Sequence, residues 1–214
     1  AQQKPNSKEV PIIDRSIFFD NPEISGGQLS PDGKYISFMK AYNGIMNIWV
    51  KRFDEAFENA KRLTDLERPS GGYMWTDDGK YILYVKDKGG NENYNVYAVA
   101  PAGTADAKTG IPENRNLTPF DDARVMIYMV SKKDPNVLMI GLNDRDPKWH
   151  DLYKLEINSG KLTKLNENKD RIGSWVFDWD EQPRLATRNP EDGSTEFLSV
   201  AKDGSLKKIY EVSP

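Results

Sequence analysis

The chain contains a single histidine, His150, and this residue limits the catalytic chemistry that the sequence can support. A triad of serine, histidine and aspartate would have to use His150 as its general base. Its neighbours, from Asp144 to Asp151, form a polar segment that also contains Arg145 and Asp146. We interpret this segment as a turn between two strands. We expect His150 to hydrogen-bond to neighbouring carboxylates there rather than to act as a base.

Other catalytic motifs that depend on spacing are absent from the sequence. An α/β-hydrolase nucleophile needs a G-x-S-x-G pentapeptide, because the strained turn lifts the serine hydroxyl clear of the sheet, and no such pentapeptide occurs. The lack of cysteine excludes disulfides, thiolate metal ligands and cysteine nucleophiles. The glycine pairs at 71–72 and 89–90 lack the lysine and Ser/Thr of a phosphate-binding loop, and they indicate turns.

Acidic residues are the remaining group that could do chemistry, and they gather at two places. Asp144 lies near Asp146, and residues 178–181 read Asp-Trp-Asp-Glu. Oxygen ligands suit calcium or magnesium, but neither segment follows the spacing of a calcium loop. We therefore expect solvated turn carboxylates, with no metal and no cofactor. A glycosidase-like pair of carboxylates facing each other across a channel stays open at this point.

Two similar segments predict the elements that position these residues. Residues 30–38 read Ser-Pro-Asp-Gly-Lys-Tyr-Ile-Ser-Phe, and residues 76–84, displaced by 46 positions, read Thr-Asp-Asp-Gly-Lys-Tyr-Ile-Leu-Tyr. In both, a turn centred on Asp-Gly leads into aromatic and β-branched residues, which is typical of a β-hairpin. A strand repeat of this length favours a β-propeller, because one four-stranded blade spans about 40 to 50 residues.

The repeat predicts an all-β chain with about four four-stranded antiparallel blades, forming a partial β-propeller. No segment has the helical periodicity that parallel βαβ units need. Counted from Asn47 to Asn95, Asp151 and Glu196, the predicted third strands recur at intervals of 48, 56 and 45 residues. The blades occupy residues 27–214 and are placed at about 27–66, 72–120, 124–167 and 173–212.

Residues 1–26 are predicted to form an N-terminal arm and a docking segment. Residues 1–12 are polar and contain two prolines, which indicates a mobile arm. Residues 12–19 include three isoleucines and two phenylalanines, so we expect them to dock on another surface as a short helix started by Asp14. Residues Ala1 to Lys4 resemble the mature end left by signal peptidase, which predicts export, most simply to the periplasm.

Charge and hydropathy narrow the classes of partner. The formal net charge is −3, so no basic field attracts phosphates and we expect no nucleic-acid partner. No apolar run approaches the length of about 18 residues that is typical of a membrane span, so none is predicted.

Several segments resemble TolB-like propellers and the propellers of prolyl oligopeptidase-family serine peptidases, which include dipeptidyl and acylaminoacyl peptidases. Residues 30–36 carry the repeat that both groups share. Three further segments favour the peptidases. They are residues 22–33, which begin Pro-Glu and end Ser-Pro-Asp-Gly, residues 142–153, which contain Asn-Asp-Arg-Asp-Pro and His-Asp-Leu-Tyr, and residues 178–187, which contain Asp-Trp-Asp and Pro-Arg-Leu-Ala-Thr.

The resemblance implies a function that this chain cannot perform alone. In the family, a propeller of seven or eight blades covers a C-terminal α/β-hydrolase domain, which carries the Ser, Asp and His, and restricts access to short peptides. No catalytic residue of this chain matches that family's triad. We therefore expect a non-catalytic propeller region that gates access of short peptides to a hydrolase domain. Candidate contacts with the substrate or that domain are Arg145, Asp146, His150 and Arg184.

Two alternatives remain open at this stage. One is a free-standing TolB-like propeller that binds protein partners in the periplasm, and the other is a propeller enzyme that uses facing carboxylates on a glycan. Four blades also leave two apolar faces uncovered unless the arc closes or another surface covers them. The arc could close as a four-bladed propeller, or two copies could complete an eight-bladed ring. We favour the homodimer.

Overall fold

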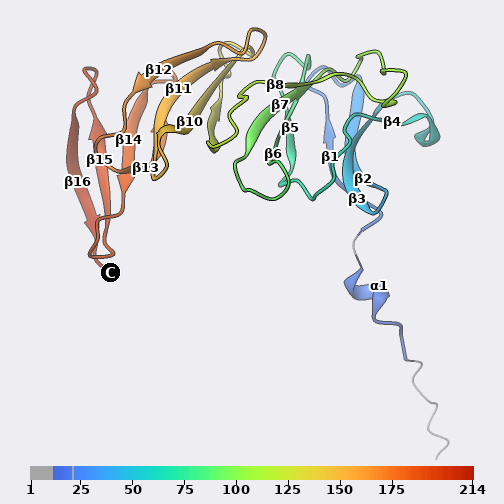
Figure 1. The fold of residues 1–214 in the computed structure, drawn as a ribbon, viewed down its shortest axis with the longest axis horizontal. Coiled ribbons are helices and arrows are strands. Elements are labelled where there is room, and N and C mark those ends of the chain that lie inside the picture. The colour runs from blue at the N-terminus through green and yellow to red at the C-terminus, as the bar shows by residue number, and fades with distance from the viewer. Residues whose placement is uncertain (1–11, 21) are drawn as a thin grey trace, which may run out of the picture.

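The structure is a computed structural model, and it describes residues 12–20 and 22–214. This part of the chain forms four antiparallel sheets of four strands each. The sheets follow one another along an arch, with the first and the last at opposite ends, so the arc is open (Figure 1). The predicted all-β fold with four four-stranded blades is confirmed.

Each sheet is built from consecutive strands that pair in chain order. The first sheet contains β1 (Ile24–Leu29), β2 (Tyr35–Tyr42), β3 (Ile45–Arg52) and β4 (Lys61–Arg62). The second contains β5 (Tyr73–Trp75), β6 (Ile82–Lys86), β7 (Asn95–Val99) and β8 (Asn114–Asn116). The third contains β9 (Val125–Val130), β10 (Val137–Asp146), β11 (Trp149–Glu156) and β12 (Leu162–Asn166). The fourth contains β13 (Ile172–Phe177), β14 (Pro183–Arg188), β15 (Thr195–Val200) and β16 (Leu206–Val212).

The two Asp-Gly repeats form the same turn at the start of the first two sheets. The Ser30 hydroxyl donates to Asp32 Oδ1 at 2.7 Å, and Thr76 donates to Asp78 Oδ1 at 2.6 Å. Each carboxylate also accepts the backbone N–H two residues later. Gly33 has φ of 72°, in the left-handed region that glycine adopts without strain. The turn therefore depends on neighbouring residues alone, which explains why the sequence predicts it.

Three buried hydrophobic clusters join adjacent sheets. Alternation along the strands places one set of side chains towards the preceding sheet and the other towards the following sheet. Each cluster has members from two adjacent sheets, such as Ile48 and Ile82, Val96 and Ile140, and Leu152 and Leu198. All six side chains are at most 2% exposed. Burial between sheets, rather than within any one sheet, is the main stabilising contribution to the arch.

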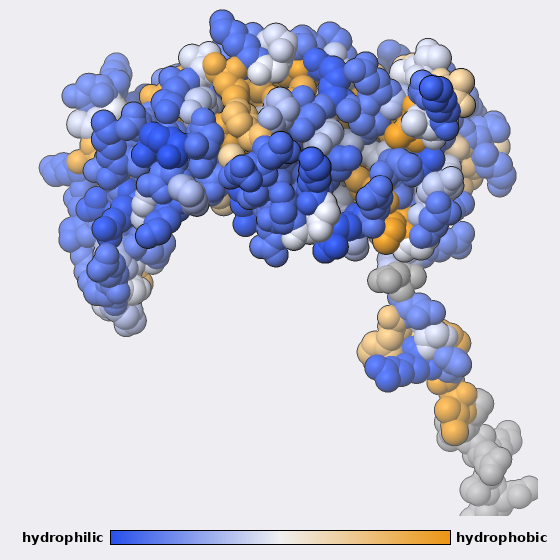
Figure 2. All heavy atoms as spheres, viewed as in Figure 1, coloured by the Kyte–Doolittle hydropathy of each residue, from blue (hydrophilic) through white to orange (hydrophobic). Residues whose placement is uncertain are grey.

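The N-terminal segment carries the described α-helix, α1 (Ser16–Phe19), which has no buried residue. The helix begins at Ser16 with Arg15 as its cap residue, and the Asp14 carboxylate, predicted to start the helix, accepts the Ser16 N–H at 2.8 Å. Ile12, at 99% exposure, Ile17 and Phe18 lie in the open, and Figure 2 shows hydrophobic residues on this protruding segment. The docking of this segment on another surface stays a prediction, and residues 1–11 of the predicted arm lie outside the described residues.

None of the helices in residues 12–20 and 22–214 combines the length and hydropathy that a span requires.

Candidate functional site

Three of the four predicted contact residues lie at one hairpin of the third sheet. Strand β10 continues to Asp146 and β11 begins at Trp149, so only Pro147 and Lys148 form the turn. Asp146 pairs with Trp149, and its carboxylate accepts the Lys148 N–H at 2.9 Å. The long polar turn predicted for residues 144–151 is therefore wrong. The Asp146 carboxylate closes a turn short enough for both strands to extend through this segment.

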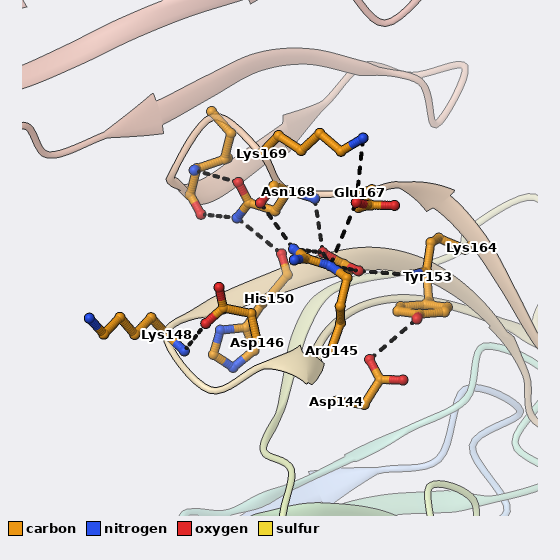
Figure 3. A network of polar contacts seen from close by, with 12 residues as sticks. Asp144, Arg145, Asp146, Lys148, His150, Tyr153, Lys164, Glu167, Asn168 and Lys169 are labelled. Carbon is orange, nitrogen blue, oxygen red and sulfur yellow. Dashed lines mark hydrogen bonds and ion pairs between the residues drawn. The ribbon is translucent and has the colours of Figure 1, made fainter.

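Asp151, on β11, is the centre of a buried polar network, and its side chain is 0% exposed. It accepts hydrogen bonds from Arg145 Nη2 at 2.8 Å and from Lys164 Nζ at 2.9 Å. A third donor is the Asn168 backbone N–H, at 2.9 Å from Oδ1. Figure 3 shows Arg145 and Lys164 reaching the same point from different strands. The network thus joins β10, β11 and β12 to the segment that leads into the fourth sheet.

The charges of this network are strongly stabilised. Burial alone would raise the pKa of Asp151, but hydrogen bonds from Arg145, Lys164 and the Asn168 backbone outweigh it and lower that pKa. The same hydrogen bonds raise the pKa of Arg145 and of Lys164. Asp151 therefore stays ionised at neutral pH and is fully paired. A carboxylate in this state contributes to structure and is a poor proton acceptor.

Most N–H groups of Arg145 form hydrogen bonds within the protein. Nε and Nη2 bond to Asp151, and Nη2 also donates to the Asn168 carbonyl at 3.1 Å. Its side chain remains 33% exposed. The contact with a substrate or another domain that the sequence predicts for Arg145 and Asp146 stays a prediction.

His150 lies beside Asp151 on β11, where alternating side chains point to opposite faces. Its Nε2 is buried and has no hydrogen-bond partner among the described residues. Burial lowers the pKa of His150, and the nearby positive charge of Arg124 lowers it further. Among the described residues the imidazole makes no hydrogen bond to a neighbouring carboxylate, so the expected contact is not found. Its predicted role as a contact residue is untested.

Arg184 lies apart from this network, near the start of β14 in the fourth sheet. Its Nε donates to Asp178 Oδ2 at 2.6 Å. Arg184 lines a cleft of about 480 Å³ between the third and fourth sheets, together with Trp175 and Leu165. The structure thus brings Arg145, Asp146 and His150 to one hairpin and leaves the fourth candidate in a separate cleft.

The acidic residues at 178–181 close a turn and join two sheets. Glu181 accepts the Ser131 hydroxyl at 2.7 Å and the backbone N–H groups of Lys132 and Lys133. Asp178 accepts two backbone N–H groups of its own turn as well as Arg184. Within the described residues, no group of three or more His, Asp or Glu side chains could hold a metal ion.

A repeated hydrogen-bonding position is the feature that sequence reasoning missed. In the first sheet, Asn47 Oδ1 accepts the Thr64 hydroxyl at 2.9 Å and the Leu66 N–H at 2.7 Å. In the second sheet, Asn95 Oδ1 accepts a threonine hydroxyl and a backbone N–H at the corresponding places, those of Thr118 and Phe120. Asp151 occupies the same strand position in the third sheet.

Glu196, on β15, occupies this position in the fourth sheet. It accepts hydrogen bonds from Arg188 Nε and, at 3.2 Å, from Lys208 Nζ. The bond from Arg188 has the largest effect in lowering the pKa of Glu196. We call Asn47, Asn95, Asp151 and Glu196 the third-strand acceptors. The signal was present, because these residues mark the repeat in the sequence, but their partners were not predicted.

Comparisons with known proteins relate the chain to part of much longer proteins. It is 33% identical over 216 residues to dipeptidyl aminopeptidase BIII of Pseudoxanthomonas mexicana, which covers 99% of this chain and 30% of that protein. It is 27% identical over 187 residues to dipeptidyl peptidase family member 6 of Caenorhabditis elegans, which covers 86% of this chain and 24% of that protein. The chain therefore spans less than a third of these curated relatives. No family model matches it.

Solved structures support the same fold. Prolyl oligopeptidase B from Galerina marginata aligns with a TM-score of 0.59 and 14% identity, covering 86% of this chain and 26% of that chain. A prolyl endopeptidase aligns with a TM-score of 0.56 and 16% identity, covering 89% and 27%. TolB from Acinetobacter baumannii aligns at 0.48 with 21% identity, covering 85% and 41%. The first two likenesses confirm the propeller blades, and the third is too weak to support an argument.

Proposed function

We propose that this chain, a propeller-like region related to the dipeptidyl aminopeptidase and prolyl oligopeptidase family, gates the access of short peptides to a serine peptidase site. The observation that carries the proposal is the identity of 33% across 99% of the chain with dipeptidyl aminopeptidase BIII. Because the chain covers only 30% of that relative, the proposal assigns catalysis to an α/β-hydrolase domain in another part of a longer protein. Short peptides and that domain are the proposed partners.

Contacts between adjacent sheets support a gating role. Polar bridges add to the apolar clusters: Lys132 Nζ contacts Asp77 Oδ1 at 2.7 Å, from the third sheet to the second. Lys133 and Ser131 bind acidic residues of the turn before β14, from the third sheet to the fourth. We call the four packed sheets the wall. If its sheets stay together, the wall excludes folded proteins by size, whereas an extended short peptide can pass. The predicted export to the periplasm stays a prediction.

The first experiment asks whether the necessary domain exists. The proposal predicts that the gene for this chain also encodes an α/β-hydrolase domain with a G-x-S-x-G pentapeptide. A fluorophosphonate probe should label one serine of that longer protein and no serine of the chain alone. Labelling of the chain alone at a defined serine, or a coding sequence without such a domain, would contradict the proposal.

A second experiment tests the gate itself in the longer protein. Glu181→Gln weakens the bonds that Glu181 accepts from Ser131 and two backbone N–H groups, and so should loosen the third sheet from the fourth. We expect dipeptide release from a long peptide to increase relative to release from a short one. Glu191→Gln is the matched control, because Glu191 is 88% exposed and Arg171 is its one ionic partner among the described residues. An unchanged ratio in Glu181→Gln would count against gating by this wall.

A further inference from the structure

The cleft between the third and fourth sheets has an apolar floor and an open mouth. Leu152 and Val200 line it and are 1% and 7% exposed, whereas Leu165 lies at 47% exposure. Its volume of about 480 Å³ is enough for a small organic molecule. We propose that this cleft binds a carboxylate attached to an apolar group, such as the C-terminal residue of a peptide.

The lining of the cleft contains a buried donor that has no acceptor among the described residues. Trp175 lines the cleft and is 6% exposed, and its indole Nε1 has no hydrogen-bond partner in the described part of the chain. By contrast, Trp75, which lies on the first strand of the second sheet, donates to Ser37 of the preceding sheet at 2.8 Å. An orphan buried donor is unfavourable unless an acceptor reaches it.

The cationic side of the cleft supplies further donors. Asp178 holds Arg184 through Nε, and the two Nη groups make no hydrogen bond within the described residues. The side chain is 40% exposed, so this half of the guanidinium can meet a ligand. Two Nη groups in one plane match the geometry of a carboxylate. The Asn166 amide also lines the cleft without a hydrogen-bond partner among the described residues.

One acidic residue lines the same cleft, and one oxygen of its carboxylate already accepts two hydrogen bonds. Asp203 Oδ1 accepts the Ser205 N–H at 2.9 Å and the Ser205 hydroxyl at 2.7 Å. Lys202, which also lines the cleft, adds a second cation. The unused polar groups are therefore mainly donors above an apolar floor. This combination suits an anion with an apolar substituent better than an inorganic anion, which would leave the floor wet.

Binding of N-acetyl-L-leucine to the ¹⁵N-labelled chain tests this inference. We expect the indole N–H resonance of Trp175, assigned with Trp175→Phe, to shift at millimolar ligand while the other indole resonances stay in place. N-acetyl-L-leucinamide has the same apolar group without the charge and should bind at least about tenfold more weakly. Inorganic phosphate should bind more weakly than the leucine derivative. Equal binding of the acid and the amide, or no shift, would overturn the proposal.

Two substitutions locate the site. Arg184→Met should weaken binding of N-acetyl-L-leucine at least about tenfold, whereas Arg171→Met, at an exposed arginine that pairs with Glu191, should leave it unchanged. If the spectrum shows that Arg184→Met does not fold, Asn166→Leu takes its place in the comparison. We expect Asn166→Leu to bind N-acetyl-L-leucine more weakly than the unsubstituted chain does. If neither Arg184→Met nor Asn166→Leu weakens binding of N-acetyl-L-leucine, the ligand does not bind in this cleft and the proposal is wrong. The test needs no peptidase activity, so its result and that of the proposed gating function are independent.

Discussion

The third-strand acceptors divide the arch into a neutral half and a charged half. In the first two sheets the acceptor is an amide, Asn47 or Asn95, which binds one threonine hydroxyl and one backbone N–H. In the last two sheets it is a carboxylate, Asp151 or Glu196, which binds an arginine and a lysine. All four lie within the first three residues of the third strand and join it to neighbouring chain segments.

The same link between the third strand and its neighbours is made by an amide in one half and by a carboxylate in the other. The two kinds of acceptor differ in how their hydrogen bonds respond to substitution and to pH. A buried amide needs only donors of ordinary strength, and its loss leaves those donors unpaired. A buried carboxylate must first be compensated for its lost hydration, so it needs cations and it responds to pH. We therefore expect the charged half to depend more on single residues and on acid than the neutral half does.

The largest expected effect is that of Asp151→Ala. The substitution leaves Arg145 and Lys164 without their shared carboxylate and the Asn168 N–H without an acceptor. We expect the free energy of unfolding to fall by about 3 kcal/mol. This is the lower end of the range for buried pairs, because the two cations are 33% and 38% exposed. Urea unfolding measures the change, and hydrogen exchange at the Asn168 amide should accelerate.

Asp151→Asn is the matched control for that prediction. It keeps an oxygen that can accept the Asn168 N–H and removes only the charge, so it should destabilise less than Asp151→Ala. If Asp151→Ala lowers the free energy of unfolding no more than Asn47→Ala or Asn95→Ala does, the distinction between the charged and the neutral half is wrong.

The next effect in size is expected from Asn47→Ala in the neutral half. The Thr64 side chain is buried, at 0% exposure, and its hydroxyl would lose its acceptor together with the Leu66 N–H. We expect a loss of about 2 kcal/mol in the free energy of unfolding. The Leu66 amide should exchange faster and the Asn168 amide should not. Asn95→Ala should have a similar effect, and a clear difference between the two would show that the repeat is not equivalent in energy.

The fold was predictable because its main signals are local. The Asp-Gly turns depend on residues next to one another, such as Ser30 and Asp32, and on the positive φ of Gly33. Each turn fixes a hairpin, and the spacing of the turns fixes the number of blades. The resemblance of residues 142–153 and 178–187 to a peptidase propeller agrees with the relatives found.

The polar site was harder to predict because its partners meet through pairing and register. Asp151 receives Lys164 from a different strand and Asn168 from beyond that strand, and no sequence pattern indicates such a meeting. The direction of His150 depends on the strand continuing through Asp146, which in turn depends on a two-residue turn. The cleft at Trp175 exists only where two sheets face each other. Sequence reasoning could name Arg184 but could not place it there.

Acid should lower the stability of the charged half more than that of the neutral half, and we expect this difference to be smaller than the effects above. The pKa of Asp151 is lowered in the folded state, so its ionisation contributes stability that is fully present above the unfolded pKa of about 4 and is lost as pH falls below it. Between neutral pH and pH about 3, Asp151→Asn should lose less stability than the unsubstituted chain does. Asn47→Ala removes no titrating group, so its pH slope should match that of the unsubstituted chain. Equal slopes in all three proteins would contradict the role assigned to Asp151.

The smallest effect is expected within the charged half, from the two lysines. Lys164→Met removes a donor to the fully buried Asp151, whereas Lys208→Met removes a donor to Glu196, whose side chain is 11% exposed. Lys208 also lies at the last strand of the arch and is 49% exposed, so solvent can replace its contacts. Urea unfolding should show a small loss of stability for Lys164→Met and a smaller one for Lys208→Met. The reverse order would mean that position along the arch, rather than burial of the acceptor, decides how much each ion pair contributes.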